Sequence, residues 1–462
     1  MLIQSDERME TRETTSFMVG VIEGFYGQPW TMAERFELFG WMARWGLNTY
    51  LYAPKDDLNH RALWRQLYSP SEAKTLGQLI EACQQSQIRF IYALSPGLDI
   101  RYSNEDELDH LKKRFEQMNG LGCQHFSLFF DDIPDGLETE DTGRLGSLAS
   151  AQCHVANSLF KWILGSCPDA RFLFCPTAYC GRMADGKLGG EGYLATIGRE
   201  LLREIDIFWT GPEIISREIT VNHVQALREV LRRKPLIWDN LHANDYDGHR
   251  FFCGPYSGRA PELRAEVSGL MCNPNTEFPL NYVPLRTLAE FARCRGAWDA
   301  RAAYLAAIQE WLPYFETVGR QVTLEDLICF GDCYYLPYEE GPEGRSLYAS
   351  ARSLLAQNPS EWGDQAALFQ ARAARLRDFC VRLSELRQRP LFYALNRRLW
   401  ELREELDLLD RYVRMKSENP SPGILGSSDF HLPGTYRGGI VAGLQGLLVQ
   451  QANGGFAPTH AA

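Results

Sequence analysis

Short apolar segments alternate with longer amphipathic segments from about residue 17 to residue 295. The short segments are rich in β-branched and aromatic residues, which is typical of strands that are buried on both faces. The longer segments have apolar residues at the three- and four-residue spacing of one helix face. The pattern predicts strands at residues 18–22, 48–53, 89–94, 126–130, 172–175, 205–209, 236–238 and 269–272.

The longer segments complete a series of strand–helix units. They predict helices at residues 32–45, 72–87, 106–119, 147–164, 192–204 and 221–233. Eight units within about 280 residues have the number and size expected of a (β/α)8, or TIM, barrel. A doubly wound open sheet is the alternative, but no glycine-rich phosphate loop follows any predicted strand. We therefore predict an α/β fold with a TIM-barrel catalytic domain at residues 17–295.

The strand pattern stops at about residue 296, and helical periodicity replaces it. Helices are predicted at residues 299–315, 324–333, 344–357, 364–387, 390–415 and 438–451, with a Pro-, Gly- and Ser-rich break at 419–428. We interpret residues 296–451 as a separate α-helical domain. The polar residues 1–16 and the final residues 452–462 are expected to be disordered or frayed tails.

Composition excludes several classes of partner. With 48 basic and 59 acidic residues the formal net charge is −11, so the chain lacks the basic surface expected of a nucleic-acid-binding protein. No apolar run approaches the length that spans a bilayer, and residues 1–16 do not resemble a signal peptide. We therefore expect neither nucleic acid nor a membrane as a partner, and a cytoplasmic location.

The metal-binding residue types show no motif. The twelve cysteines form no CxxC pair, and reduced thiols that pack as small apolar groups are the preferred interpretation. The nine histidines show no HExxH spacing. Asp245, Asp247 and His249 share one predicted loop, but their spacing fits no standard metal-binding loop. The sequence predicts no metal and no cofactor.

Polar residues follow the C-terminal end of every predicted barrel strand. In a TIM barrel these ends open on one face, so the polar residues are expected to converge on one pocket. The segments concerned are 23–27, 54–57, 95–99, 131–132, 176–179, 210–212, 239–247 and 273–275.

The most informative of these segments is 125–134 (HFSLFFDDIP), where a β-favouring run ends in Asp131 and Asp132. Carboxylates at the end of a short apolar strand are costly to bury unless they are used or paired. An ordinary exit from strand to loop would also explain two adjacent aspartates. The polar groups predicted around them favour a catalytic role in acid–base chemistry, of which glycoside hydrolysis is the commonest example.

The remaining candidates suit a sugar. Tyr26, Tyr179, Trp238 and Tyr246 offer apolar faces with polar edges. Lys55, Asn240, Asp245 and Asn273 offer hydrogen bonds to hydroxyl groups. Each of these residues taken alone also has a structural explanation, such as barrel core for Trp238.

The adjacency of the two aspartates favours one mechanism. Two-carboxylate glycosidases usually place the pair on opposite sides of the sugar, whereas neighbours on one strand end approach it from the same side. One carboxyl group could protonate the leaving oxygen. The other could hold a 2-acetamido group whose carbonyl oxygen attacks the anomeric carbon and forms an oxazoline.

Several segments resemble glycoside hydrolase family 84, the β-N-acetylglucosaminidases that include the protein O-GlcNAcases. They are 21–30 (VIEGFYGQPW), 48–57 (NTYLYAPKDD), 92–99 (YALSPGLD), 130–133 (FDDI), 238–247 (WDNLHANDYD) and 273–275 (NPN). Segments 324–327, 335–339 and 436–439 resemble the helical stalk of that family. The resemblance covers essentially the whole chain.

The resemblance implies roles for the candidates. Asp131 would orient and polarise the acetamido group, and Asp132 would act first as general acid and then as general base. The sugar hydroxyls would be bound by the backbone of Gly24 and by Lys55, Asp245 and Asn273. Asn240 would hold the acetamido region, Tyr179 would bond its carbonyl oxygen, and Cys175 and Trp238 would form walls of the pocket.

The resemblance also sets expectations for substrate and assembly. The substrate would be β-linked N-acetylglucosamine on glycoproteins or glycosides, and the helical domain would form a homodimer. Ala178 stands where the animal enzymes have Glu. The long stalk insert and the acetyltransferase-like domain of the animal enzymes are expected to be absent, as are the additional modules of secreted members.

Three alternatives to an O-GlcNAcase activity remain. The chain could be a catalytically silent sugar-binding module. It could be a glycosidase that uses a protein nucleophile on sugars without an acetamide. It could also be a hexosaminidase that acts on bacterial or scavenged N-acetylglucosamine glycans.

Overall fold

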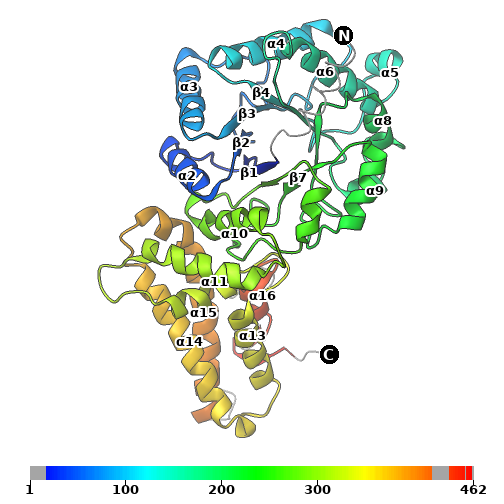
Figure 1. Ribbon diagram of the computed structural model, residues 1–462. Coiled ribbons are helices and arrows are strands. Elements are labelled where there is room, and N and C mark those ends of the chain that lie inside the picture. The colour runs from blue at the N-terminus through cyan, green and yellow to red at the C-terminus, as the bar shows by residue number, and fades with distance from the viewer. Residues whose placement is uncertain (1–16, 419–435, 453, 460–462) are drawn as a thin grey trace. The chain divides into compact units, whose positions relative to one another are not determined.

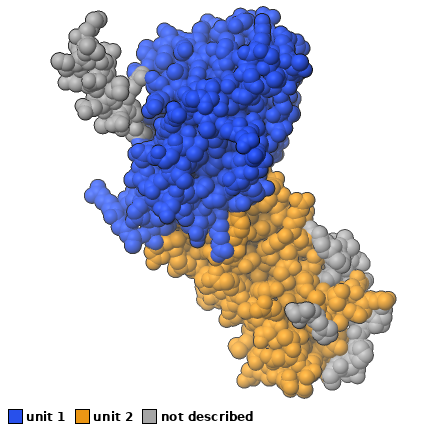
Figure 2. Space-filling model, turned by 90° about the vertical axis from the view of Figure 1, so that its right-hand side faces the viewer, with its two compact units in different colours: residues 1–241, 258–274, 289–298 blue, residues 242–257, 275–288, 299–462 orange. Residues whose placement is uncertain are grey.

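The computed structural model describes residues 17–418, 436–452 and 454–459. They form two compact units, which are coloured separately in Figure 2. Unit 1 contains residues up to 241 together with 258–274 and 289–298, and unit 2 contains 242–257, 275–288 and the residues from 299 onward. The sequence analysis placed a single boundary after residue 295. Two segments that precede this boundary in the sequence, 242–257 and 275–288, instead belong to unit 2.

Unit 1 is built on a closed barrel of eight parallel strands in sequence order (Figure 1), which confirms the predicted TIM barrel. Strand β1 pairs with both β2 and β8, and Met18 lies opposite Gly269 where the barrel closes. The strands are β1 (Met18–Glu23), β2 (Thr49–Tyr52), β3 (Arg89–Leu94), β4 (His125–Phe129), β5 (Phe172–Cys175), β6 (Asp206–Trp209), β7 (Leu236–Asp239) and β8 (Gly269–Cys272).

Helices surround the barrel (Figure 1), and local sequence signals begin and end them. Thr31 and Glu34 form a capping box at the start of α2, and Gly46 ends it in a left-handed conformation. The helical segments are α2 (Met32–Trp45), α3 (Pro70–Gln85), α4 (Glu105–Gly120), α5 (Thr139–Leu145), α6 (Leu148–Ile163), α7 (Gly181–Asp185), α8 (Tyr193–Glu200), α9 (Val221–Leu231) and η1 (Pro261–Ala265). Helix α10 (Tyr282–Arg293) has residues in both units.

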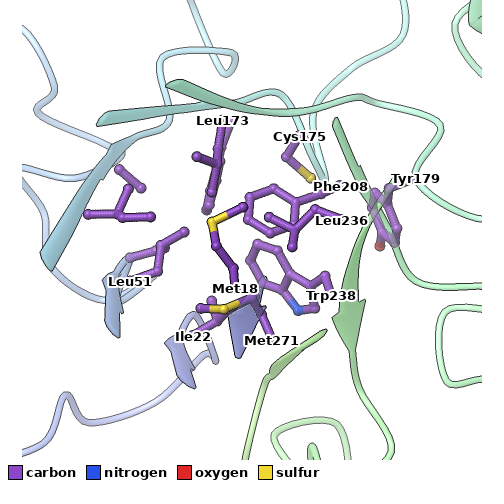
Figure 3. Packing of buried hydrophobic residues seen from close by; sticks show 14 of the residues in the cluster. Met18, Ile22, Leu51, Leu173, Cys175, Tyr179, Phe208, Leu236, Trp238 and Met271 are labelled. Carbon is purple, nitrogen blue, oxygen red and sulfur yellow. The ribbon is translucent and has the colours of Figure 1, made fainter. Parts of the chain in front are cut away.

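The inside of the barrel is filled by apolar side chains rather than forming a channel. Figure 3 shows the indole of Trp238 among Met18, Phe208 and Met271. Phe129 lies 5.3 Å from Trp238 between ring centres, and Phe208 lies 5.4 Å from Trp238. This aromatic layer therefore lies at or next to the last residue of β4, β6 and β7.

Unit 2 is mainly helical. Its long helix α15 buries leucines on one face, among them Leu395, Leu399, Leu402 and Leu406, and packs beside α14. The elements are η2 (Phe278–Asn281), α11 (Ala300–Trp311), η3 (Leu312–Phe315), α12 (Leu324–Cys333), α13 (Pro342–Leu355), η4 (Pro359–Glu361), α14 (Asp364–Leu383), α15 (Arg389–Glu418), α16 (Gly439–Gln445), β9 (Leu448–Gln450) and β10 (Phe456–Pro458).

The predicted helix at residues 438–451 is wrong beyond residue 445. Helix α16 ends at Gln445, and β9 follows and pairs antiparallel with β10. Within this hairpin Leu448 and Phe456 are buried, whereas Val449 is 42% exposed. The strand β10 also corrects the expectation that residues 452–462 are frayed throughout. The predicted tail 1–16 and the predicted break 419–428 lie outside the described residues.

Within the part of the chain that the structure describes, no helix is both long and apolar enough to cross a lipid bilayer.

Candidate active site

Asp131 and Asp132 follow the last residue of β4 by two and three positions. The backbone N–H of Phe130 still bonds to the carbonyl of Cys175 at 2.9 Å, so sheet geometry persists up to the first aspartate. Asp132 then has φ of +52°, in the left-handed region that few residues other than glycine, asparagine and aspartate adopt. The chain therefore leaves strand geometry between the two carboxylates.

Asp131 is buried and forms an ion pair with the ammonium group of Lys55, which follows β2. Burial by itself raises the pKa of Asp131, but the charge of Lys55 outweighs this effect and the pKa is lowered from its ordinary value. Lys55 contacts only Oδ2. Among the described residues, Oδ1 of Asp131 is buried without a hydrogen-bond partner. The site thus contains an ionised carboxylate with one oxygen available to a donor.

Asp132 is exposed and accepts two phenol hydrogen bonds. Tyr26 donates to Oδ2 at 3.0 Å, and Tyr179 donates to Oδ1 at 2.8 Å. Burial, followed by the charge of Asp132, raises the pKa of both tyrosines, so each remains a protonated donor. The Lys55 ammonium lies 6.0 Å from the centre of the Tyr26 ring. Lys55, which pairs with Asp131, thus lies near the ring of Tyr26, which donates to Asp132.

Trp238, Asn240 and Asn273 form a second polar group at the ends of β7 and β8. Trp238 Nε1 donates to Asn240 Oδ1 at 2.9 Å, and Asn273 Nδ2 donates to the same oxygen at 3.0 Å. Asn240 Nδ2 donates to the Ile214 carbonyl at 2.8 Å, which fixes the orientation of its amide. Oδ1 of Asn273 is buried without a partner among the described residues, and is a second acceptor available to a ligand.

Gly24 and Cys175 complete the predicted set within unit 1. A Cβ atom on Gly24 would lie 2.8 Å from Cζ2 of Trp238, so the close approach of this backbone to the indole requires glycine. Burial, and then the charge of Asp131, raises the pKa of the Cys175 thiol well above its ordinary value. Cys175 is therefore a neutral, apolar part of the site.

Sequence analysis missed Arg61. Its Nη2 donates to the backbone carbonyl of Asp132 at 2.6 Å, and its Nη1 donates to the hydroxyl of Tyr26 at 3.2 Å. Arg61 lies in the same loop as Lys55, which is the only signal that the sequence offers. Which atoms it contacts depends on how that loop folds back over the barrel, and this cannot be derived from residue spacing.

Comparison with known proteins places this arrangement in a family. The NAGidase family, described as beta-N-acetylglucosaminidase, matches residues 19–323. The chain belongs to this β-N-acetylglucosaminidase family.

Two curated relatives, Protein O-GlcNAcase of Rattus norvegicus and of Mus musculus, are each 48% identical to it over 273 residues. That match covers 59% of this chain and 30% of each relative, so the chain matches less than a third of their length. A solved structure of a mutant O-GlcNAc hydrolase from Thermobaculum terrenum superposes with a TM-score of 0.78 at 29% identity. It covers 87% of this chain and 85% of that one.

Two other carboxylates at the ends of the β-N-acetylglucosaminidase barrel strands are held by arginines. Glu23 is buried against Arg35, with Nη2 of Arg35 at 2.7 Å from Oε1 and Nε at 2.9 Å from Oε2. Asp239 is buried against Arg259, with Nε at 2.7 Å from Oδ2 and Nη2 at 2.8 Å from Oδ1. Each of these two carboxylates uses both oxygens in an ion pair, whereas Lys55 occupies only one oxygen of Asp131.

Asp245 and Tyr246 belong to unit 2, whereas the other ten predicted site residues belong to unit 1. Tyr246 is 42% exposed. The prediction that these two residues bind substrate therefore stays a prediction. His249, from the same loop, lies with Nδ1 at 2.7 Å from Glu401 Oε1 within unit 2. Across the described residues, no group of three or more His, Cys, Asp or Glu side chains is arranged to hold a metal ion.

Proposed function

We propose that this protein is a retaining exo-β-N-acetylglucosaminidase that removes O-linked β-N-acetylglucosamine from Ser and Thr of proteins by substrate-assisted catalysis. The observation that carries the proposal is the unequal environment of two adjacent aspartates. Asp131 is buried, paired with Lys55 and has one oxygen without a partner, whereas Asp132 is exposed and hydrogen-bonded to Tyr26 and Tyr179. Such a pair suits one fixed anion and one group that exchanges a proton with the glycosidic oxygen and then with water.

In the first step, Oδ1 of Asp131 accepts the acetamido N–H, which increases the electron density on the acetamido carbonyl oxygen. That oxygen donates an electron pair to the anomeric carbon as the bond to the leaving oxygen breaks, and an oxazolinium ring closes. Asp132 gives its proton to the leaving oxygen, so the alcohol departs neutral. The carboxylate of Asp131 stabilises the positive charge that develops on the ring nitrogen.

In the second step, Asp132 is a carboxylate and removes a proton from water. The water oxygen bonds to the anomeric carbon from the face that the alcohol left, and the carbon–oxygen bond of the oxazoline breaks. The acetamido group is restored and Asp132 is again protonated. Two inversions at the anomeric carbon give overall retention.

The remaining residues would bind the sugar. Lys55, Asn273 and the backbone of Gly24 are proposed to bond its hydroxyls, together with Asp245. Asn240 would support the acetamido region, Tyr179 would move its donor from Asp132 to the acetamido carbonyl, and Cys175 and Trp238 would form apolar walls. Tyr26 and Tyr246 are proposed to present ring faces to the substrate.

The choice of O-linked N-acetylglucosamine on proteins is supported by the 48% identity to Protein O-GlcNAcase. The test compares two substrates with the purified full chain. One is an O-GlcNAc-modified peptide, and the other is a chitobiose-type glycan with the same terminal sugar. A kcat/KM for the peptide above that for the glycan supports the proposal. A reversed preference would indicate a hexosaminidase of free glycans.

The stereochemical part of the proposal has its own test. Proton NMR of an aryl N-acetylglucosaminide during hydrolysis should show the β-anomer of the free sugar first, before mutarotation. Initial release of the α-anomer would contradict retention. The matching aryl glucoside, which has no acetamide, serves as the control and should be hydrolysed far more slowly.

We also propose that unit 2 forms a homodimer. Tyr393 and Trp400 lie seven residues apart on α15, two helical turns on one face, and are 66% and 50% exposed. Light scattering of the chain should give twice the monomer mass, and Tyr393→Glu with Trp400→Glu should give the monomer mass. A wild-type monomer at micromolar concentration would contradict this proposal.

A cytoplasmic location is proposed on the state of the cysteines. All twelve are unpaired and ten of them are buried, as reducing compartments permit. Cell fractionation with a compartment marker is the test, and recovery outside the cytoplasm would contradict it.

A further inference from the structure

The loop that follows β2 contributes one cation to each catalytic aspartate. Lys55 pairs with the side chain of Asp131. Arg61, six residues further along, donates from Nη2 to the backbone carbonyl of Asp132 at 2.6 Å. Its Nη1 donates to the hydroxyl of Tyr26 at 3.2 Å, and that hydroxyl in turn donates to the Asp132 carboxylate at 3.0 Å. Arg61 therefore reaches both ends of Asp132, the backbone directly and the side chain through Tyr26.

Asp132 needs such support because its backbone conformation is unfavourable. A left-handed backbone conformation is less favourable than an extended or right-handed one for an L-amino acid, and it persists where its surroundings fix it. The direction of the carboxylate depends on that conformation, because the backbone sets where the Cα–Cβ bond points. A rotation of the peptide that carries the Asp132 carbonyl would redirect the carboxyl group away from the leaving oxygen.

Arg61 is itself held rigidly. It is 8% exposed, and the two residues before it are anchored through their backbone carbonyls. The carbonyl of His60 accepts from the N–H of Ser95 at 2.9 Å. The carbonyl of Asn59 accepts from Arg114 Nη1 at 2.8 Å. The loop thus transfers the rigidity of the barrel wall to the guanidinium group.

We propose that Arg61 is a positioning residue for the general acid, which holds the left-handed turn at Asp132 and aims its carboxyl group at the glycosidic oxygen. This inference rests on the proposed role of Asp132 and adds a residue to it. The planar guanidinium offers two donors in a fixed geometry, one for the Asp132 carbonyl and one for Tyr26. A lysine at this position has one ammonium centre and cannot reproduce both contacts at once.

The test uses leaving-group dependence, because a misplaced acid matters only where the departing oxygen needs a proton. Wild type, Arg61→Met and Arg61→Lys are assayed for kcat/KM on a dinitrophenyl and a phenyl N-acetylglucosaminide. For Arg61→Met, kcat/KM should fall about 10²-fold on the phenyl glycoside and only a few-fold on the dinitrophenyl glycoside. Arg61→Lys should show a smaller loss in the same direction.

Arg65→Met is the matched control from the same loop. Arg65 forms ion pairs with Asp99 at 2.7 Å and with Glu107 at 2.6 Å, so its charge serves carboxylates other than Asp132. Its removal loosens the loop but takes no hydrogen bond from Asp132 or Tyr26. The kcat/KM values for both substrates should therefore change by the same factor. Circular dichroism and thermal unfolding verify that each variant is folded, and Arg61→Lys decides the test if Arg61→Met does not fold.

The outcomes separate this inference from the function on which it rests. If wild type hydrolyses both substrates and Asp132→Asn loses activity only on the phenyl glycoside, the proposed role of Asp132 as general acid is supported. If Arg61→Met or Arg61→Lys then lowers kcat/KM for both substrates by the same factor, the positioning role of Arg61 is overturned. The proposed role of Asp132 as general acid is then unaffected. If wild type hydrolyses neither glycoside, the proposed function itself fails.

Discussion

Lys55 and Asp131 form a buried ion pair that occupies one oxygen of the carboxylate and leaves the other without a protein partner. The pair joins the loop after β2 to the end of β4 across the mouth of the barrel. Burial of an isolated carboxylate would favour its protonated form, and the lysine reverses that tendency. The ionised state of Asp131 in the proposed mechanism thus depends on Lys55.

The first prediction concerns pH. Asp131 acts as an anion, so kcat/KM is lost as the pH falls through its lowered pKa. In Lys55→Met burial remains but the opposing charge is gone, which raises the pKa of Asp131. The acidic limb of the kcat/KM profile for a dinitrophenyl N-acetylglucosaminide should therefore move to higher pH. Lys55→Arg retains the charge and is the control. An acidic limb at the same pH in wild type and Lys55→Met would contradict the dependence.

The second prediction concerns the backbone of Asp132. Asparagine tolerates a left-handed conformation and alanine does not, because an amide side chain can bond to the local backbone. Both substitutions remove the acid. Asp132→Ala should be less stable to urea than Asp132→Asn by about 1 kcal/mol. Equal unfolding midpoints would indicate that the turn is not strained.

The third prediction concerns Gly24. A methyl group there meets Trp238 and Ile22 at 2.8 Å, and Trp238 is packed against Phe129 and cannot yield freely. Gly24→Ala should cost about 1–3 kcal/mol of stability and raise KM, because a displaced indole carries Asn240 with it.

Gly40→Ala is the control for this substitution. Gly40 lies on α2, and an added Cβ would meet nothing within 4 Å. It should gain about 0.5–1 kcal/mol from its better helix propensity. A Gly24→Ala protein with wild-type stability and KM would show that the indole can move.

The strands and the pair of aspartates could be predicted from the sequence, because both depend on local pattern. The strands β3, β5 and β8 have their predicted bounds, since a short apolar run between polar residues leaves little choice of register. The contacts that distinguish the two aspartates could not be predicted. They depend on the path of the loop after β2, which brings Lys55 to the side chain of Asp131 and Arg61 to the backbone of Asp132.

The left-handed conformation of Asp132 also could not be predicted from the sequence, and neither could the strands β9 and β10. An aspartate is compatible with both extended and left-handed backbone, so the residue alone does not choose. The apolar run at residues 438–451 fits a helix, and only the pairing of Leu448 with Pro458 across the hairpin makes its last part a strand.

The fourth prediction concerns a carboxylate to which we assign a structural role. Asp239 and Arg259 form an ion pair whose side chains are 1% and 0% exposed. Asp239→Asn leaves a buried guanidinium without its counter-charge and should cost about 3–5 kcal/mol. The surface pair Arg182 and Glu213, at 59% and 51% side-chain exposure, is the control, and Arg182→Met should leave the free energy of unfolding nearly unchanged. Urea unfolding measures both, and equal losses would contradict this assignment.

The central claim is that the acetamide of the bound sugar, and no protein side chain, forms the first bond to the anomeric carbon. Its most direct test is the rate of hydrolysis of one aryl N-acetylglucosaminide with zero, one, two and three fluorine atoms on the N-acetyl group. Fluorine withdraws electrons from the carbonyl oxygen, so kcat/KM should fall steeply with each added atom. A rate that is independent of fluorination, with a sugar covalently attached to the protein, would contradict the account.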